Sequence, residues 1–191
     1  MKRSLAGLLI LMGCQSGPPP RTYVLGAPVA SVAGLSNETG RPVLDLRRVS
    51  LPDYLDTSDI QVRDGRNQLT PSATGRWGER LSVGITHALG EGLARRLPGV
   101  VVSWNGGASG QRLQVDVEAF DVSASGGCVL TARWTVRRDG QSTAGTVFRG
   151  TFVAQAANMA DAAVVAAMGD AIEQLAAGIA RSIGGTKKGG A

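Results

Sequence analysis

The most restrictive feature of the sequence is the alternation of apolar and polar residues in three consecutive segments of its second half. Segments 112–121, 130–137 and 146–155 place apolar side chains at every second position, as β-strands with one buried face do. Gly126-Gly127 and the hairpin signal Asp139-Gly140 separate them. The pattern predicts an antiparallel meander with one buried face. The residues expected on that face are Leu113, Val115, Val117, Ala119, Leu130, Ala132, Trp134, Val136, Phe148 and Phe152.

Two other segments repeat apolar residues at spacings of three and four, the period of an amphipathic helix. The first runs from Arg76 to Leu97 and stops at Pro98-Gly99; the second follows Asn158, a candidate N-cap, and stops at Gly184-Gly185. The sequence therefore predicts an α+β fold, a mostly antiparallel sheet with two amphipathic helices packed on one face. The expected stripes are Trp77, Leu81, Ile85, Leu89, Leu93 and Leu97, then Val164, Met168, Ile172, Leu175, Ile179 and Ile183.

The region before the first helix predicts shorter strands joined by turns. A Ser-, Gly- and Asn-rich stretch at 30–41 reads as a loop, and a Pro-containing break is expected at 71–75. Asp64-Gly65 predicts a hairpin turn. The strands expected in this region and after the first helix are 23–25, 43–49, 60–63, 67–70 and 100–104.

The N-terminus has the order of a bacterial lipoprotein signal. Lys2 and Arg3 precede a short apolar run, Leu5–Met12, that is too short to span a bilayer, and Leu11-Met12-Gly13-Cys14 matches a lipobox. We expect residues 1–13 to be removed and the Cys14 thiol to carry a diacylglycerol. An ordinary signal peptide is the alternative. We also expect a tether at 14–21, one domain at 22–184 and a disordered tail at 185–191.

The composition offers little for catalysis or nucleic-acid binding. The net charge is +5, and removal of Lys2 and Arg3 lowers it to +3, without a dense basic block of the kind that nucleic-acid binding needs. His87 is the one histidine, and Cys128 is the one cysteine besides Cys14, so no metal-ligand set or nucleophilic motif is present. We predict a non-enzymatic protein without a metal or cofactor, in which Cys128 is a buried hydrophobe.

A motif in the first half carries a family resemblance. The segment Leu51–Leu69, which reads LPDYLDTSDIQVRDGRNQL, and the segment Arg76–Leu81 resemble the PqiC-like family of ABC-type transport auxiliary lipoproteins, partners of MCE-domain lipid transporters. Members read LP-x-Y-L, I-x-x-R, N-x-L and RWAE-x-L in this order. The chain departs from the pattern at Gly78, where Ala is commoner. The resemblance covers about residues 20–183.

The resemblance implies a non-enzymatic subunit of an envelope lipid transporter. An ATPase and permease would work at the inner membrane, an MCE-domain protein would form the conduit, and this lipoprotein would dock the conduit at the outer membrane. A homo-oligomeric ring is also implied. Gln15 after the lipidated cysteine favours the outer membrane, because Asp at this position favours inner-membrane retention in enteric bacteria.

The bend at the start of the motif is our hypothesis for the partner interface, formed by Leu51, Pro52, Tyr54 and Leu55. Trp77 fits either this interface or the core. Two other functions stay open at this point: an outer-membrane lipoprotein that regulates a periplasmic enzyme, and a small carrier that holds a lipid in its own cavity.

Overall fold

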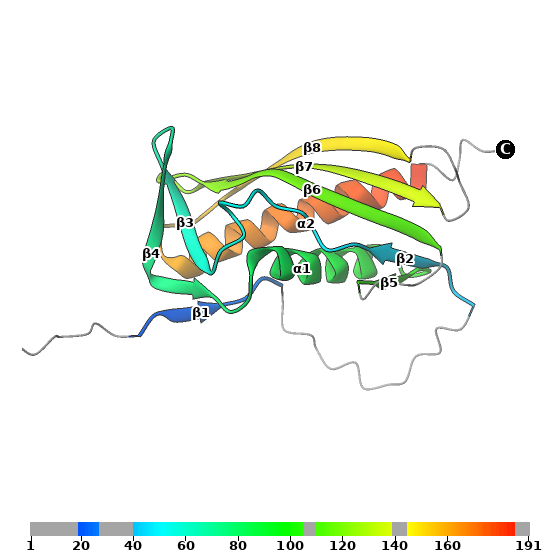
Figure 1. Cartoon of the computed structure of the whole chain (residues 1–191), viewed down its shortest axis with the longest axis horizontal. Coiled ribbons are helices and arrows are strands. Elements are labelled where there is room, and N and C mark those ends of the chain that lie inside the picture. The colour runs from blue at the N-terminus through cyan, green and yellow to red at the C-terminus, as the bar shows by residue number, and fades with distance from the viewer. Residues whose placement is uncertain (1–18, 27–39, 105–109, 139–144, 186–191) are drawn as a thin grey trace, which may run out of the picture.

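The computed structural model describes residues 19–26, 40–104, 110–138 and 145–185 (Figure 1). The elements in chain order are β1 (Arg21–Tyr23), β2 (Val43–Leu46), β3 (Asp59–Asp64), β4 (Gln68–Trp77), α1 (Leu81–Arg96), β5 (Val101–Ser103), β6 (Gln111–Val122), β7 (Gly127–Arg138), β8 (Thr146–Gln155) and α2 (Asp161–Gly185). The α+β class predicted from the sequence is confirmed.

The predicted meander forms three adjacent strands, up to the β8 edge, of a five-stranded sheet with the order β5-β2-β6-β7-β8. Strands β6, β7 and β8 pair antiparallel, as the alternation predicted. Strand β2 joins the sheet parallel to both β5 and β6. The sequence predicted these two strands as longer segments but not their parallel pairing, because three or four ordered residues carry too little periodicity to fix direction.

One buried position in β6 was predicted wrongly. The β6–β7 register shifts between Val117 and Ala119, a β-bulge that inserts one residue and reverses the alternation. Phe120 and Val122 therefore point into the core, at 2% and 1% exposure, and Ala119 does not.

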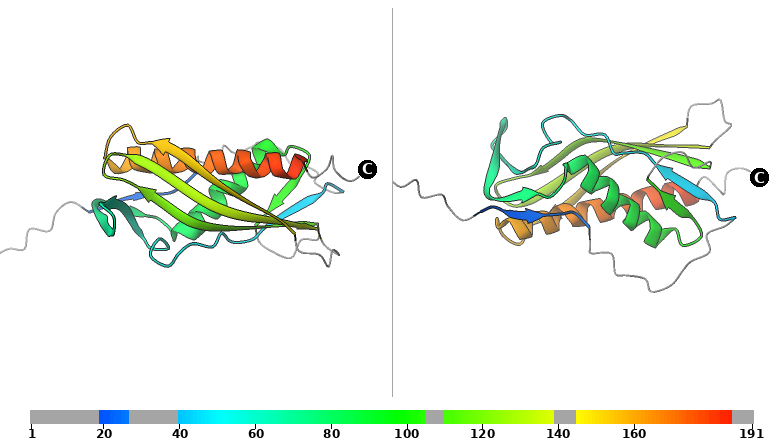
Figure 2. Two further views of the ribbon diagram at one scale, coloured as in Figure 1. Left: turned by 90° about the horizontal axis from the view of Figure 1, so that it is seen from above. Right: turned by 60° about the horizontal axis from the view of Figure 1, so that its bottom comes forward.

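Both helices pack on the same face of this sheet (Figures 1 and 2). Helix α2 lies over β7 and β8: a Cβ on Gly178 would lie 3.1 Å from the Phe152 ring. Helix α1 packs beside α2, where a Cβ on Gly92 would lie 3.0 Å from the Cβ of Ala176. A Cβ on Gly90 would lie only 2.8 Å from the Trp104 ring. The helix-weakening glycines at 90 and 92 thus permit close packing.

The two apolar stripes form the core with the inner face of the sheet. All six residues of the second stripe are buried, and in the first only Leu97 is partly exposed. Among the helices of the described residues, α2 alone is long and apolar enough to cross a bilayer by composition. Its packing against the sheet and α1 identifies it as the core helix of a folded domain.

A second sheet, with the order β1-β4-β3, closes one end of the molecule. Strand β4 runs through 71–75, where a break was predicted, and through Trp77, so α1 begins at Leu81 and not at Arg76. Pro71 is tolerated because β1 pairs only with Gly75–Trp77, which leaves Pro71 beside a single neighbour, β3. The hairpin turn at Asp64-Gly65 is confirmed, with Gly65 at φ 67°.

Smaller boundary errors have local causes. The first strand is Arg21–Tyr23, not 23–25, because it pairs with β4 at these residues. The strand predicted at 43–49 ends at Leu46, after which single hydrogen bonds to β6 continue from Arg47 and Ser50. Asn158 Oδ1 accepts a hydrogen bond from Ala160 N–H at 2.9 Å, one turn before α2, and does not cap the helix. The predicted loop at 30–41 and the Asp139-Gly140 turn lie largely or wholly outside the described residues.

Candidate docking surface

Some residues of the motif segment Leu51–Leu69 are buried and pack into the core. Leu55 is 5% exposed and Ile60 is fully buried, and both belong to the same apolar cluster as Trp77 and Leu81. Trp77 is 6% exposed, which supports the core alternative for this residue. Much of the family motif is therefore explained by packing.

Asp56 in this segment completes the start of α1. The helix has no side-chain cap of its own and no acidic residue in its first turn. The Asp56 carboxylate accepts the Ser82 N–H at 3.0 Å from outside the helix, and Arg80 lies 3.6 Å away. Burial pushes the pKa of Asp56 upward, but the Ser82 hydrogen bonds and the charges of Arg80 and Arg48 outweigh it and hold the pKa below its usual value. A carboxylate at a helix N-terminus is favourable.

The exposed half of the segment reaches the helix-free face of the five-stranded sheet, which we call the open face. Tyr54 is 41% exposed there, and the charges of Arg63 of β3 and Asp121 of β6 act on its phenol. Arg63 donates to Asp121 at 2.8 Å. Burial raises the pKa of the Tyr54 phenol and the Asp121 charge raises it further, against the effect of Arg63, so the hydroxyl stays protonated at neutral pH.

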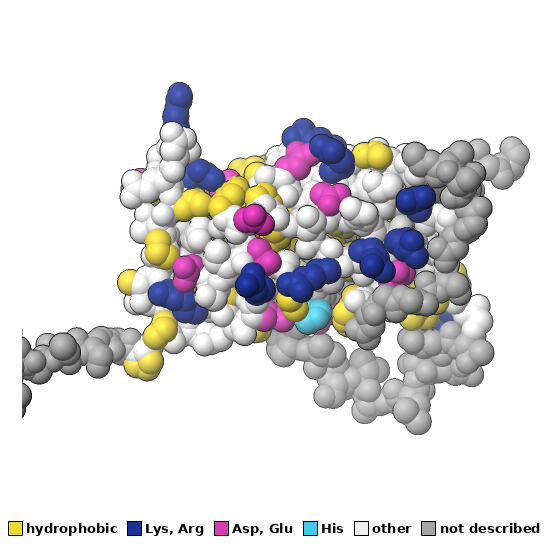
Figure 3. Space-filling view, viewed as in Figure 1, with side chains coloured by type: hydrophobic (Ala, Val, Ile, Leu, Met, Phe, Trp, Pro, Cys, Tyr) yellow, Lys and Arg dark blue, Asp and Glu magenta, His cyan; other side chains and the backbone are white. Residues whose placement is uncertain are grey.

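The strand pairing places two exposed valines in line with Asp121 across β7 and β8. Asp121 lies opposite Val129 of β7, and Val129 lies opposite Val153 of β8. The two valines are 39% and 59% exposed. We call Tyr54, Val129 and Val153 the apolar end of the open face. Figure 3 shows hydrophobic side chains gathered on the side of the β3–β4 hairpin.

The middle of the open face carries a charge network. Arg133 and Arg149 lie directly opposite each other on β7 and β8. Glu118 of β6 bridges them, accepting Arg133 Nη2 at 2.8 Å and Arg149 Nε at 2.8 Å. Hydrogen bonding to Arg149, and then to Arg133, holds the pKa of Glu118 below its usual value despite some opposing desolvation. The exposed bridge relieves the repulsion of the facing arginines.

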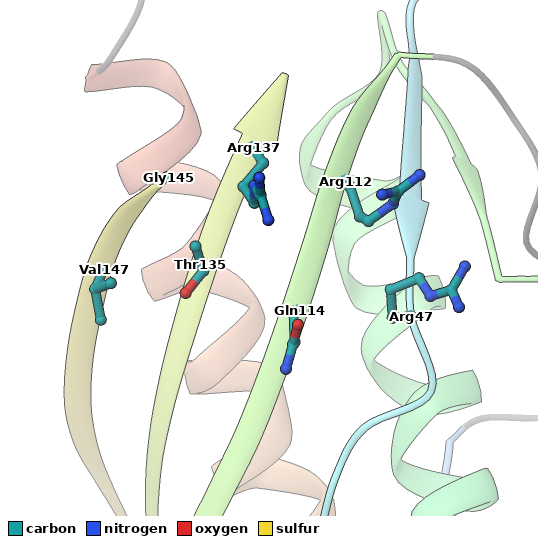
Figure 4. Close-up of a pocket in the computed structure, with 7 residues that line it drawn as sticks. All are labelled: Arg47, Arg112, Gln114, Thr135, Arg137, Gly145 and Val147. Carbon is teal, nitrogen blue, oxygen red and sulfur yellow. The ribbon is translucent and has the colours of Figure 1, made fainter. Parts of the chain in front are cut away.

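The other end of the open face is cationic. Arg112 of β6 lies opposite Arg137 of β7, and Arg47 follows β2 beside them. They surround a surface pocket of about 540 Å³ (Figure 4). We call this site the cationic pocket; its lining includes Arg47, Arg112, Gln114, Thr135, Arg137 and Val147.

The structure separates the four residues of the interface hypothesis. Tyr54 is exposed, Leu51 and Pro52 are partly exposed, and Leu55 lies in the core. Cys14 lies outside the described residues.

Cys128 is fully buried, and burial, with the charges of Asp121 and Asp170, raises the pKa of its thiol to about 12. Within the described residues, no group of three or more His, Cys, Asp or Glu side chains is placed to hold a metal ion.

The cationic pocket was not predicted from the sequence. Its arginines come from three separated segments, and at each position an exposed arginine is ordinary for the polar face of a strand. The signal that was available is the register of the meander: Arg112 and Arg137 occupy corresponding polar positions on neighbouring strands.

Comparison with known proteins gives one family and a set of similar folds. Residues 23–180 match the family model for the ABC-type transport auxiliary lipoprotein component. A crystal structure of an uncharacterized protein matches with TM-score 0.72 and 22% identity, covering 87% of this chain and 99% of that one. A Xanthomonas campestris protein of the DUF330 family matches with TM-score 0.63 and 15% identity, covering 85% and 90%. No curated protein matches. At these identities the two structures support the fold alone.

Proposed function

Because the chain belongs to the family of ABC-type transport auxiliary lipoproteins, we propose that it is the non-enzymatic, lipid-anchored subunit that docks the MCE-domain conduit of an envelope lipid transporter at the outer membrane. The family match over residues 23–180 carries this proposal. The Leu11-Met12-Gly13-Cys14 sequence and Gln15 support the anchor and its membrane. The lipid-carrier alternative gains no support from the described pockets, which lie open on the surface.

The anchor has a direct test. Mass spectrometry of the mature protein should find Cys14 as the N-terminal residue with a diacylglycerol on sulfur, and the protein should fractionate with the outer membrane. A Cys14→Ala variant should lose the acyl mass and leave the membrane, because two or three acyl chains supply nearly all of the membrane affinity. A mature N-terminus elsewhere with an unmodified Cys14 contradicts the proposal.

We place the docking contact at the apolar end of the open face, with Tyr54 at its centre. An exposed aromatic ring on the same face as exposed valines has the composition of an interface anchor. Leu51 and Pro52 lie at its edge. Leu55 supports this surface from the core and is not itself a contact.

The substitution Tyr54→Asp should reduce co-purification with the MCE-domain protein at least tenfold, since loss of an aromatic hot spot costs about 2 kcal/mol or more. The matched control is Val24→Asp, which places the same charge at an exposed residue lining the groove between α1 and α2. Leu55→Asp is unsuitable, because it buries a charge and unfolds the domain. Unchanged co-purification of folded Tyr54→Asp, or equal loss in both variants, removes this surface from the proposal.

A further inference from the structure

The cationic pocket is not explained by the fold or by the docking role. It lies at the end of the sheet where β6 begins and β7 ends, and β1, from which the tether departs, lies at the opposite end of the long axis (Figure 1). Figure 3 shows Lys and Arg side chains gathered over that part of the sheet. The cationic pocket and β1 therefore lie at opposite ends of the described domain.

Two of the three arginines of the pocket lie within ion-pair distance of one buried carboxylate. Asp45 of β2 is 1% exposed, and neither of its oxygens has a hydrogen-bond partner among the described residues. Its Oδ2 lies 3.6 Å from Arg112 Nε and 3.8 Å from Arg47 Nη1. Both guanidinium groups remain about half exposed. Asp45 is therefore a carboxylate that two of the three arginines of the pocket share.

The third arginine, Arg137, differs from the other two in its surroundings. Arg137 makes no ion pair with any described acidic residue, in contrast to Arg133 and Arg149 on the same face, which share Glu118. In Figure 4, Arg137 stands on β7 across from Arg112, with Thr135 and Gln114 on neighbouring positions below them. The site thus combines guanidinium and hydroxyl groups around one concavity with the Gln114 amide, whose Nε2 also lies 3.4 Å from Asp116 Oδ1.

This donor set matches one ligand chemistry. Guanidinium groups bind phosphate oxygens bidentately, and hydroxyl and amide groups add neutral hydrogen bonds. Val147, 58% exposed, provides an apolar wall at the β8 side of the pocket. We propose that the cationic pocket binds a phosphate group, and that the apolar wall favours the phosphate of a single phospholipid headgroup over free phosphate. This proposal does not depend on the docking contact at Tyr54.

The test uses the full mature lipoprotein in a non-ionic detergent, with binding measured by calorimetry. The probes are dihexanoylphosphatidylglycerol below its micelle concentration, inorganic phosphate, and dihexanoylglycerol, which has no phosphate. We expect the phospholipid to bind, phosphate to compete with it, and dihexanoylglycerol not to bind. Tighter binding of the phospholipid than of phosphate identifies a headgroup site, whereas equal binding identifies a site for the phosphate group alone.

Variants assign the binding to the pocket. Arg137→Gln and Arg112→Gln should each weaken phosphate-dependent binding about tenfold or more, because each removes a charged hydrogen bond. Arg149→Gln is the matched control, an arginine of the same face that pairs with Glu118 outside the pocket; it should bind normally. Thermal unfolding should show that all three variants fold.

Three results overturn the proposal. They are absence of phosphate-dependent binding by the folded protein, equal weakening by Arg149→Gln and Arg137→Gln, and binding of a hexaglutamate peptide more tightly than either phosphate probe, which would identify an acidic protein segment as the ligand. Failure of docking is separable, because Tyr54→Asp should retain phospholipid binding and Arg137→Gln should retain co-purification with the MCE-domain protein.

Discussion

The two faces of the five-stranded sheet differ in role: the face under the helices forms the core, and the open face carries the proposed binding surfaces. On β7, Cys128, Leu130 and Ala132 are fully buried beneath the helices, whereas Val129, between the first two, is 39% exposed on the open face. The covered face is continuous and apolar. The open face changes from apolar at Tyr54, through the Glu118 network, to cationic at Arg137. Because the open face does not form the core, its side chains can be apolar at one end and cationic at the other without loss of the fold.

The largest expected difference between the faces is in stability. Trp134 lies on the covered face, stacked 5.8 Å from the Phe148 ring, with its indole N–H bonded to Ser182 at 3.1 Å. Trp134→Ala should lower the free energy of unfolding by about 3–5 kcal/mol, because the cavity cannot close. Arg133→Ala, one residue away on the open face, should lower it by less than about 1 kcal/mol. Denaturant titration measures both, and similar losses would abolish the distinction between the faces.

An intermediate effect is expected where the motif segment joins α1. Asp56→Ala should cost about 1 kcal/mol, the usual value of a lost helix cap. Because the pKa of Asp56 is lower in the folded than in the unfolded chain, its contribution is present above the unfolded pKa and is lost as the pH falls through the folded pKa. The variant should therefore approach the wild type in stability under acid conditions. Asp53→Ala, an exposed change in the same loop, is the control; an equal loss there would exclude the cap.

The smallest effect is expected in the middle of the open face. Glu118→Gln should leave the denaturation midpoint unchanged at neutral pH, since the network is exposed to solvent. NMR titration of the wild type should still detect the charge contacts, because they hold the pKa of Glu118 below its usual value. Arg149→Gln should raise that pKa more than Arg133→Gln, because Arg149 contacts Glu118 through both Nε and Nη2 and Arg133 through Nη2 alone. An ordinary pKa for Glu118 would show that the bridge does not form in solution.

The covered face was predictable and the open face was not, for a physical reason. Burial imposes a period on the sequence, so the stripes from Ile85 to Leu93 and from Val164 to Ile183 could be identified residue by residue. Polar positions on the open face obey no such constraint, and their grouping depends on strand register. Within the motif, the same sequence pattern held both the exposed Tyr54 and the buried Leu55, which only the fold could separate.

Photo-crosslinking in intact cells tests most directly whether the open face is where this lipoprotein meets the transporter. Val153 on the open face and Val24 beside the helices are both 59% exposed, so a benzophenone amino acid at either position has equal access to a partner. We predict an adduct with the MCE-domain protein, identified by mass spectrometry, from position 153 and none from position 24. An adduct from position 24 with none from position 153 would contradict the account.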